Sequence, residues 1–168
     1  MEFVTAIERL AREKTCFVGM GNYFKRDDAV GLYIVDGIRD RLGAGPVTAL
    51  NVEDVIENYV FSIARGEADN VVIVDAVQAG GEEGSVIFTS LDEFNEMNGN
   101  YSTHKMALFL SGKVLAEHEK KTWLLGVEVR DIDFGEGLSD KVKQSADYLR
   151  DILLSYINCD QKELVYEH

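Results

Sequence analysis

Cysteine is scarce in this chain of 168 residues, which has only Cys16 and Cys159. The two have neither the C-x-x-C spacing of a zinc or redox site nor the pattern of a disulfide framework. Cys16 lies in the apolar run TCFVGM and is predicted to be a buried thiol, whereas Cys159 lies in a polar C-terminal segment. Thiols outside any framework are typical of a reducing compartment, so we expect a cytoplasmic protein.

Long apolar runs and basic charge are also lacking. No apolar stretch reaches the roughly 18 residues of a membrane span, and the first residues, MEFVTAIERLAREK, lack the pattern of a signal peptide. Lys and Arg number 17 against 30 Asp and Glu, so the formal net charge is −13. This charge repels phosphate backbones, so we expect no nucleic acid partner and no membrane insertion, whereas metal cations or a basic peptide would be attracted. The absence of a heptad repeat or an obvious apolar edge predicts a monomer.

The pattern of elements predicts one domain over residues 1–168, with 1–14 as an N-terminal helical extension and 158–168 as a polar tail. Helical periodicity covers 2–13, 29–42, 55–66, 102–120 and 138–157, and strands are predicted at TCFVGM, PVTALNV, NVVIVDAV, SVIFTSL and TWLLGVEV, with a polar loop over 95–101. This alternation predicts an α/β fold, a three-layer α/β/α sandwich around a mostly parallel central sheet.

Binding sites in such folds form at the carboxyl ends of the strands, which here points to residues 19–31, 75–84 and 99–104. The first loop contains a G-x-G sequence followed by Asp27 and Asp28 at the start of a helix. Phe24 occupies the third glycine position of a dinucleotide fingerprint, and the acidic pair opposes phosphate. The loop therefore favours a cation over a nucleotide, although either aspartate could simply cap the helix.

Asp75 ends the apolar stretch VVIVD, and His104 lies at the start of the next predicted helix. Each has an ordinary alternative, as a strand-end carboxylate bonded to a neighbouring loop or as an exposed first-turn histidine. Together, Asp28, Asp75 and His104 would place two carboxylates and one imidazole at one edge of the sheet. Such a set suits a divalent metal such as nickel or zinc and leaves room for water or a substrate group.

Three blocks in this order resemble the hydrogenase maturation endopeptidases. They are Gly19-x-Gly21-Asn22 with Asp27-Asp28 and Gly31, the segment VVIVDAVQAGGEEG, and Ser102-Thr103-His104. The resemblance covers residues 15–157. It implies an endopeptidase that removes a C-terminal extension from a nickel-loaded nickel–iron hydrogenase large-subunit precursor. This precursor is therefore the expected partner of the protein. The resemblance also implies metal binding by Asp28, Asp75 and His104, which would recognise nickel supplied by the substrate.

The chain departs from the family in two segments that would face the substrate. The stretch NVEDVIENYV lacks the glycines and the proline that the family often has before its second helix, and Glu83 replaces a proline that commonly follows the central aspartate. The second acidic residue of the opening motif is Asp28 and not glutamate. An aspartate at this position resembles the branch of the family that serves membrane-associated, formate-hydrogenlyase-type or energy-converting hydrogenases.

The predicted mechanism is metal-assisted hydrolysis, because no G-x-S-x-G elbow is present and neither cysteine is near the predicted site. Asp28, Asp75 and His104 would hold the ion, and Asp27 would orient one of its ligands. A non-hydrolytic nickel-sensing or chaperone module for hydrogenase assembly is the alternative, which would bind the loaded precursor without cutting it. A nucleotide-binding enzyme is a further alternative, which a nucleotide-dependent thermal shift would support.

Overall fold

The computed structural model describes residues 2–97 and 103–166, and it describes the side chains of residues 2–97 and 105–158. Two single turns of 3-10 helix, η1 and η2, accompany the helices and strands. The elements in chain order are α1 (Phe3–Arg12), β1 (Thr15–Met20), η1 (Arg26–Ala29), α2 (Val30–Arg39), β2 (Val47–Glu53), η2 (Ile56–Asn58), α3 (Val60–Arg65), β3 (Asn70–Val77), β4 (Val86–Ser90), α4 (Leu91–Met97), α5 (Thr103–Glu117), β5 (Lys121–Glu128) and α6 (Asp140–Tyr166).

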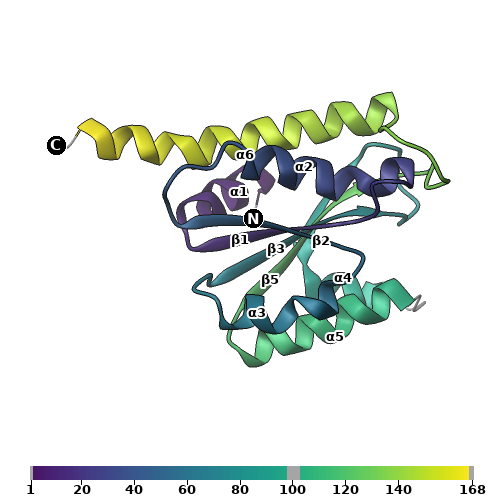
Figure 1. Ribbon diagram of the computed structural model, residues 1–168, viewed down its shortest axis with the longest axis horizontal. Helices are drawn as coiled ribbons and strands as arrows, with labels where there is room; N and C mark the ends of the chain where they lie inside the picture. The colour runs from purple at the N-terminus through teal and green to yellow at the C-terminus, as the bar shows by residue number, and fades with distance from the viewer. Residues whose placement is uncertain (1, 98–102, 167–168) are drawn as a thin grey trace.

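The strands form one sheet in the order β2-β1-β3-β5-β4. The first four are parallel, and β4 pairs with β5 in the antiparallel direction at the edge. Figure 1 shows α1, α2 and α6 on one face of this sheet and α3, α4 and α5 on the other. The predicted three-layer α/β/α sandwich around a mostly parallel sheet is thus confirmed.

The central strand β3 is buried on both faces, as its continuous apolar sequence predicts. Val72 and Val74 pack in the core beneath α1, α2 and α6, whereas Val71 and Ile73 pack in the core beneath α3 and α5. Each fully buried side chain of this size contributes about 1.5–3 kcal/mol through removal of its apolar surface from water. The strand is therefore a rigid support for any residue at its carboxyl end.

The first helix, which lies in the predicted N-terminal extension, packs into the core. Its apolar stripe buries Ala6, Ile7, Leu10 and Ala11, and the Oγ of Thr15 donates a hydrogen bond of 2.6 Å to the Leu10 carbonyl. These residues pack against α6 and the sheet because the stripe repeats at helical spacing.

Four of the predicted elements differ in their bounds from the structure. The predicted helix over 55–66 is divided into η2 and α3, where the β-branched pair Val55-Ile56 disfavours a continuous helix. The predicted loop over 95–101 begins within a helix, α4, whose two buried residues are too few to establish a period. α6 continues past the predicted end at 157 to Tyr166, and α2 ends before 42.

No helix in the described part of the chain is both long and apolar enough to cross a membrane.

Candidate functional site at the carboxyl edge of the sheet

Two glycines, one in the loop after β1 and one at the start of α2, are packed so closely that neither can carry a side chain. Gly21 has a φ of 138°, and a Cβ there would lie 2.0 Å from the carbonyl oxygen of Asp28. At Gly31, in the first turn of α2, a Cβ would lie 2.1 Å from the Val74 carbonyl oxygen and 2.6 Å from that of Met20. α2 therefore begins directly over the carboxyl ends of β1 and β3, with Asp28 in the turn that precedes it.

The same geometry bears on the nucleotide alternative. Close approach of this helix to the sheet occurs at Gly31, whereas Phe24, in the third position of the fingerprint, is 65% exposed. Asp27 and Asp28 lie in η1, immediately before α2, where a bound phosphate would need positive potential. The loop is thus better suited to a cation than to a phosphate.

Asp28 and Asp75 lie at this one edge of the sheet. Asp28 is half-buried in η1, which packs against β3. Asp75 is 3% exposed, and its Oδ1 accepts a hydrogen bond of 2.8 Å from the backbone N of Ala76. The pairing of β3 with β1 ends at Val74, but the pairing with β5 continues to Val77. Asp75 is therefore not the last residue of its strand, which accounts for its burial.

The start of α5 reaches the same edge. α5 has 15 residues, so at about 1.5 Å per residue it extends about 22 Å, nearly the length of the sheet. It ends at Glu117, just before β5 begins at Lys121 on the amino edge, so Thr103 lies at the carboxyl edge. Figure 1 shows α2 and α5 beginning at the same end of the molecule. The side chain of His104, the second residue of α5, lies outside the described residues, as does the whole of Ser102.

The candidate site lies between the two helical layers. Residues two apart in a strand share a face, and Ile73 and Val77 pack in the core beneath α3 and α5. Asp75 therefore faces the layer that contains α5, whereas Asp28 comes from the turn before α2, in the opposite layer. A molecule at this edge would contact both.

Asp27 is fully buried, and its carboxylate joins two distant segments. Its Oδ1 accepts a hydrogen bond from the backbone N of Ser139, and its Oδ2 accepts one from the Oγ of the same residue, each 2.7 Å long. The Ser139 Oγ also lies 3.2 Å from Oε1 of Glu83, one of the positions at which the chain departs from the resembled family. The predicted role of Asp27 in orienting a metal ligand stays a prediction.

Glu128 is a further carboxylate at this edge, which the sequence analysis does not single out. It is the last residue of β5 and is 3% exposed. Its carboxylate oxygens accept hydrogen bonds of 3.0 Å from the backbone N of Ala79 and of Gly80. Glu128 thereby fixes the turn that follows Asp75. The sequence feature that could have identified Glu128 is that it is the only charged residue in the apolar run TWLLGVEV.

Cys16 is not a candidate nucleophile for this edge. It pairs with Val71 near the amino end of β3, and Asp75 lies four residues further along, roughly 13 Å at about 3.3 Å per residue. Burial raises the pKa of the Cys16 thiol, so the reactive thiolate is disfavoured.

Tyr23 serves to anchor the opening loop. Its hydroxyl donates a hydrogen bond of 2.6 Å to Oδ2 of Asp36, whose Oδ1 accepts one of 2.6 Å from Nδ2 of Asn51. Burial, together with the bond to Asp36, raises the pKa of Tyr23 to about 12. The phenol stays protonated at neutral pH and ties the loop to α2 and β2.

Two of the three predicted metal ligands lie among the described side chains, and their role stays a prediction. Among residues 2–97 and 105–158, no three His, Cys, Asp or Glu side chains form a group that could hold a metal ion. Asp28 and Asp75 fall within these ranges, and His104 does not. Two carboxylates at one edge fit a divalent cation chemically, and an imidazole from the start of α5 would complete a mixed oxygen and nitrogen set.

Comparison with known proteins matches residues 47–156 to a family described as hydrogenase maturation protease. Among curated proteins, a candidate hydrogenase maturation protease from Methanocaldococcus jannaschii is 26% identical over 153 residues, which cover 86% of this chain and 89% of that protein.

Two solved structures show the same fold. The [NiFe] hydrogenase maturation protease HycI from Thermococcus kodakarensis KOD1 superposes with a TM-score of 0.78 at 24% identity, over 91% of this chain and 99% of that one. The hydrogenase maturating endopeptidase HybD from Escherichia coli gives a TM-score of 0.71 at 20% identity, over 88% of this chain and 93% of that one.

Proposed function

The chain belongs to the hydrogenase maturation protease family, and on this premise we propose that it removes a C-terminal extension from a nickel–iron hydrogenase large-subunit precursor. The observation that carries the proposal is the placement of Asp28 and Asp75 at one edge of the sheet, beside the start of α5. Cys16 is buried away from this edge, so the reaction is better served by activated water than by a thiolate.

The ion in this proposal is nickel already inserted into the precursor, so it is part of the substrate. A substrate-borne ion keeps ligands of its own, and Asp28, Asp75 and His104 need only complete its coordination. When bound, it polarises the scissile carbonyl or lowers the pKa of a water molecule. Because Asp75 is already withdrawn from water, it loses little further hydration when a cation arrives.

The two adjacent aspartates have different proposed tasks. Asp28 is half-buried, so its carboxylate can both face the ion and accept a proton from the attacking water. Asp27 keeps the loop, and hence Asp28, in position through its two hydrogen bonds from Ser139. Cleavage would then report that nickel has been inserted, because a precursor without the ion lacks the group that these residues recognise.

The test is cleavage of the large-subunit precursor from the same host, purified with and without nickel, with the loss of C-terminal mass as the readout. Wild type would be compared with Asp28→Asn, Asp75→Asn and His104→Ala. Asp54→Asn is the matched control, since it removes an exposed carboxylate just after β2 at the same edge. We expect wild type to cut only the loaded precursor, and the three variants to be slower by about 100-fold or more.

The outcomes separate this function from its alternative. Unchanged cleavage by Asp28→Asn and Asp75→Asn, with their folds intact by circular dichroism, would refute the site. Tight binding of the loaded precursor by wild type without any loss of mass would instead indicate the non-hydrolytic nickel-sensing or chaperone module.

A further inference from the structure

Two phenylalanines project from the carboxyl edge next to the candidate site. Phe24 is 65% exposed in the loop after β1, and Phe134 is 80% exposed in the loop between β5 and α6. Side chains of this size leave a large apolar area in water when they are exposed, and paired exposure of this kind marks interaction surfaces. We call Phe24 and Phe134 the aromatic rim.

The two loops that carry the aromatic rim are fastened to each other. The backbone N of Gly135 donates a hydrogen bond of 2.9 Å to the Phe24 carbonyl, and the backbone N of Arg26 donates one of 3.1 Å to the Gly135 carbonyl. An ion pair of 2.7 Å joins Arg26 to Asp131. Each phenylalanine therefore projects from a backbone that is already ordered, so binding a partner would cost little conformational entropy there.

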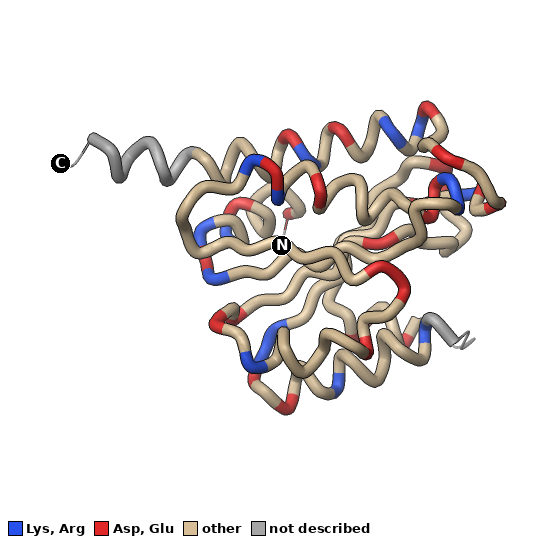
Figure 2. Tube along the Cα trace, viewed as in Figure 1, with Lys and Arg blue, Asp and Glu red and all other residues tan. Residues whose placement is uncertain are grey.

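The two loops that carry the rim are acidic overall, because the cations Lys25, Arg26 and Arg130 are outnumbered by the carboxylates Asp27, Asp28, Asp131, Asp133 and Glu136. Lys25 lies with its Nζ 5.8 Å from the centre of the Phe134 ring, and Arg26 is neutralised by Asp131. Asp133 and Glu136 are exposed on either side of Phe134. Figure 2 shows further acidic residues in the loops at this end of the molecule, and the whole chain carries −13. The electrostatic complement of this rim is a basic segment.

The rim is continuous with the candidate site. Phe24 lies four residues before Asp28 in the chain. The backbone N of Asp27 donates a hydrogen bond of 3.1 Å to the Asp131 carbonyl, in the loop that carries Phe134. A peptide whose scissile bond lies at Asp28 and Asp75 would therefore pass over the aromatic rim within a few residues of the cut.

We propose that Phe24 and Phe134 form the docking surface for the precursor segment that flanks the scissile bond, and that this segment carries apolar side chains together with basic charge. This inference rests on the proposed function and adds to it the surface and the chemistry by which the substrate is held. The rings bury the apolar side chains, and Asp133 and Glu136 attract the positive charge.

The experiment measures kcat and KM for cleavage of the nickel-loaded precursor by the full chain. The double variant Phe24→Ala/Phe134→Ala should raise KM by about 10-fold or more and leave kcat within about two-fold, because the rim binds without touching the reacting atoms. Phe24→Leu/Phe134→Leu should recover most of the loss. Tyr148→Ala is the matched control, since it removes an aromatic ring that is 57% exposed on α6.

A second pair of variants tests the charge. Asp133→Lys/Glu136→Lys should raise KM, and its KM should respond less steeply to added salt than that of wild type. An unchanged KM in this variant would overturn the assignment of a basic segment.

The remaining outcomes are equally distinct. If wild type cuts the precursor and the double alanine variant has the KM of wild type, the docking surface is overturned and the proposed function stands. A fall in kcat at constant KM would also overturn docking. If wild type neither binds nor cuts the loaded precursor, the proposed function fails, and the docking surface fails with it.

Discussion

The carboxylate of Asp27 accepts two hydrogen bonds from Ser139, one from its backbone N and one from its Oγ, although the two residues are 112 positions apart in the chain. Ser139 is also the residue whose carbonyl accepts the first hydrogen bond of α6, from Lys143. The contact thereby fastens the loop that carries Asp28 to the beginning of the last helix. A fully buried carboxylate needs such partners, because an unsatisfied charge in the interior is strongly unfavourable.

Removing this carboxylate should destabilise the fold. Asp27→Ala leaves the Ser139 N–H without its acceptor and should lower the free energy of unfolding by about 2–3 kcal/mol, whereas Ser139→Ala, which removes only the Oγ bond, should cost about 1 kcal/mol. Urea unfolding followed by circular dichroism measures both. A larger loss in Ser139→Ala than in Asp27→Ala would contradict this assignment.

Gly31 is predicted to be intolerant of a single methyl group. In Gly31→Ala the new Cβ would meet the backbone carbonyls of Val74 and Met20, which cannot move without displacing two strands, so we expect a loss of about 3 kcal/mol. Gly66→Ala is the control, because its nearest backbone neighbour is 3.2 Å away and its φ is negative. Equal midpoints of urea unfolding for the two variants would show that α2 does not pack this closely against β1 and β3.

Glu128 should control the order of the turn after Asp75. In Glu128→Ala the backbone N–H groups of Ala79 and Gly80 lose their acceptor, so their hydrogen exchange should accelerate by about 10-fold or more. Glu128→Gln, which retains one acceptor oxygen, should have an intermediate effect. The amide of Val74, deeper in β3, is the internal reference, and acceleration there as well would indicate general loosening of the sheet.

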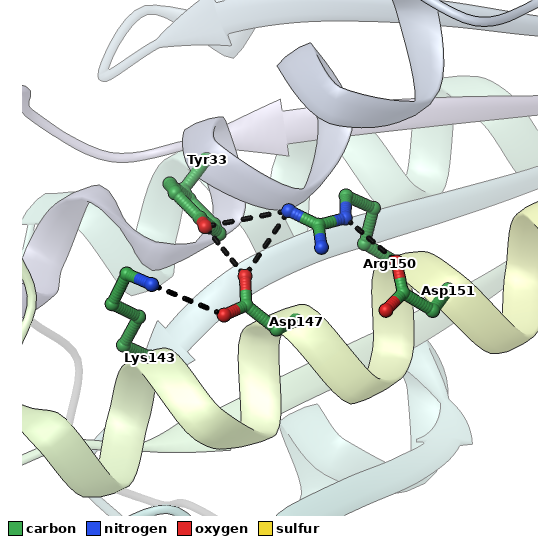
Figure 3. A network of polar contacts seen from close by, with 5 residues as sticks. All are labelled: Tyr33, Lys143, Asp147, Arg150 and Asp151. Atoms are coloured by element: carbon green, nitrogen blue, oxygen red, sulfur yellow. Dashed lines mark hydrogen bonds and ion pairs between the residues drawn. The ribbon is translucent and has the colours of Figure 1, made fainter.

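α2 and α6 are linked by a polar network (Figure 3). The hydroxyl of Tyr33 donates to Oδ1 of Asp147, and Lys143 and Arg150 lie 3.2 Å and 3.1 Å from the oxygens of the same carboxylate. The bond from Tyr33, ahead of the neighbouring cations, lowers the pKa of Asp147. The same bond raises the pKa of Tyr33.

These shifts predict a loss of stability at both extremes of pH. A lowered aspartate pKa contributes stability above the ordinary value of 3.8, and this is lost as the pH falls through the folded-state pKa. A raised tyrosine pKa contributes stability below 10.0, and this is lost as the pH rises through the folded-state pKa.

The free energy of unfolding, measured as a function of pH for Asp147→Asn and Tyr33→Phe, tests both predictions. Asp147→Asn should weaken the loss of stability at acid pH, and Tyr33→Phe should weaken the loss at alkaline pH. Each variant should also lower the free energy of unfolding by about 1 kcal/mol near neutral pH. Asp151→Asn, which removes a more exposed carboxylate from α6, serves as the control. If the first two variants lose stability with pH in the same way as wild type, the network is not the source of these losses.

The helices and strands could largely be predicted, because their signals are local. β3 (Asn70–Val77) matches its predicted range, since an uninterrupted apolar run of that length is typical of a central strand. α4 (Leu91–Met97) and the division between η2 and α3 escaped prediction. Their lengths are too short for a period to emerge, and packing beneath the sheet sets their geometry.

The sequence by itself determined the mostly parallel sandwich and the placement of Asp28 and Asp75 at the same edge of the sheet, because parallel strands bring their carboxyl ends to one edge. Only the tertiary structure revealed the bond between Asp27 and Ser139 and the paired loops of Phe24 and Phe134. These contacts join segments more than a hundred residues apart through only a few hydrogen bonds. Such pairings leave no periodic pattern in either segment, so they become visible only when the chain is folded.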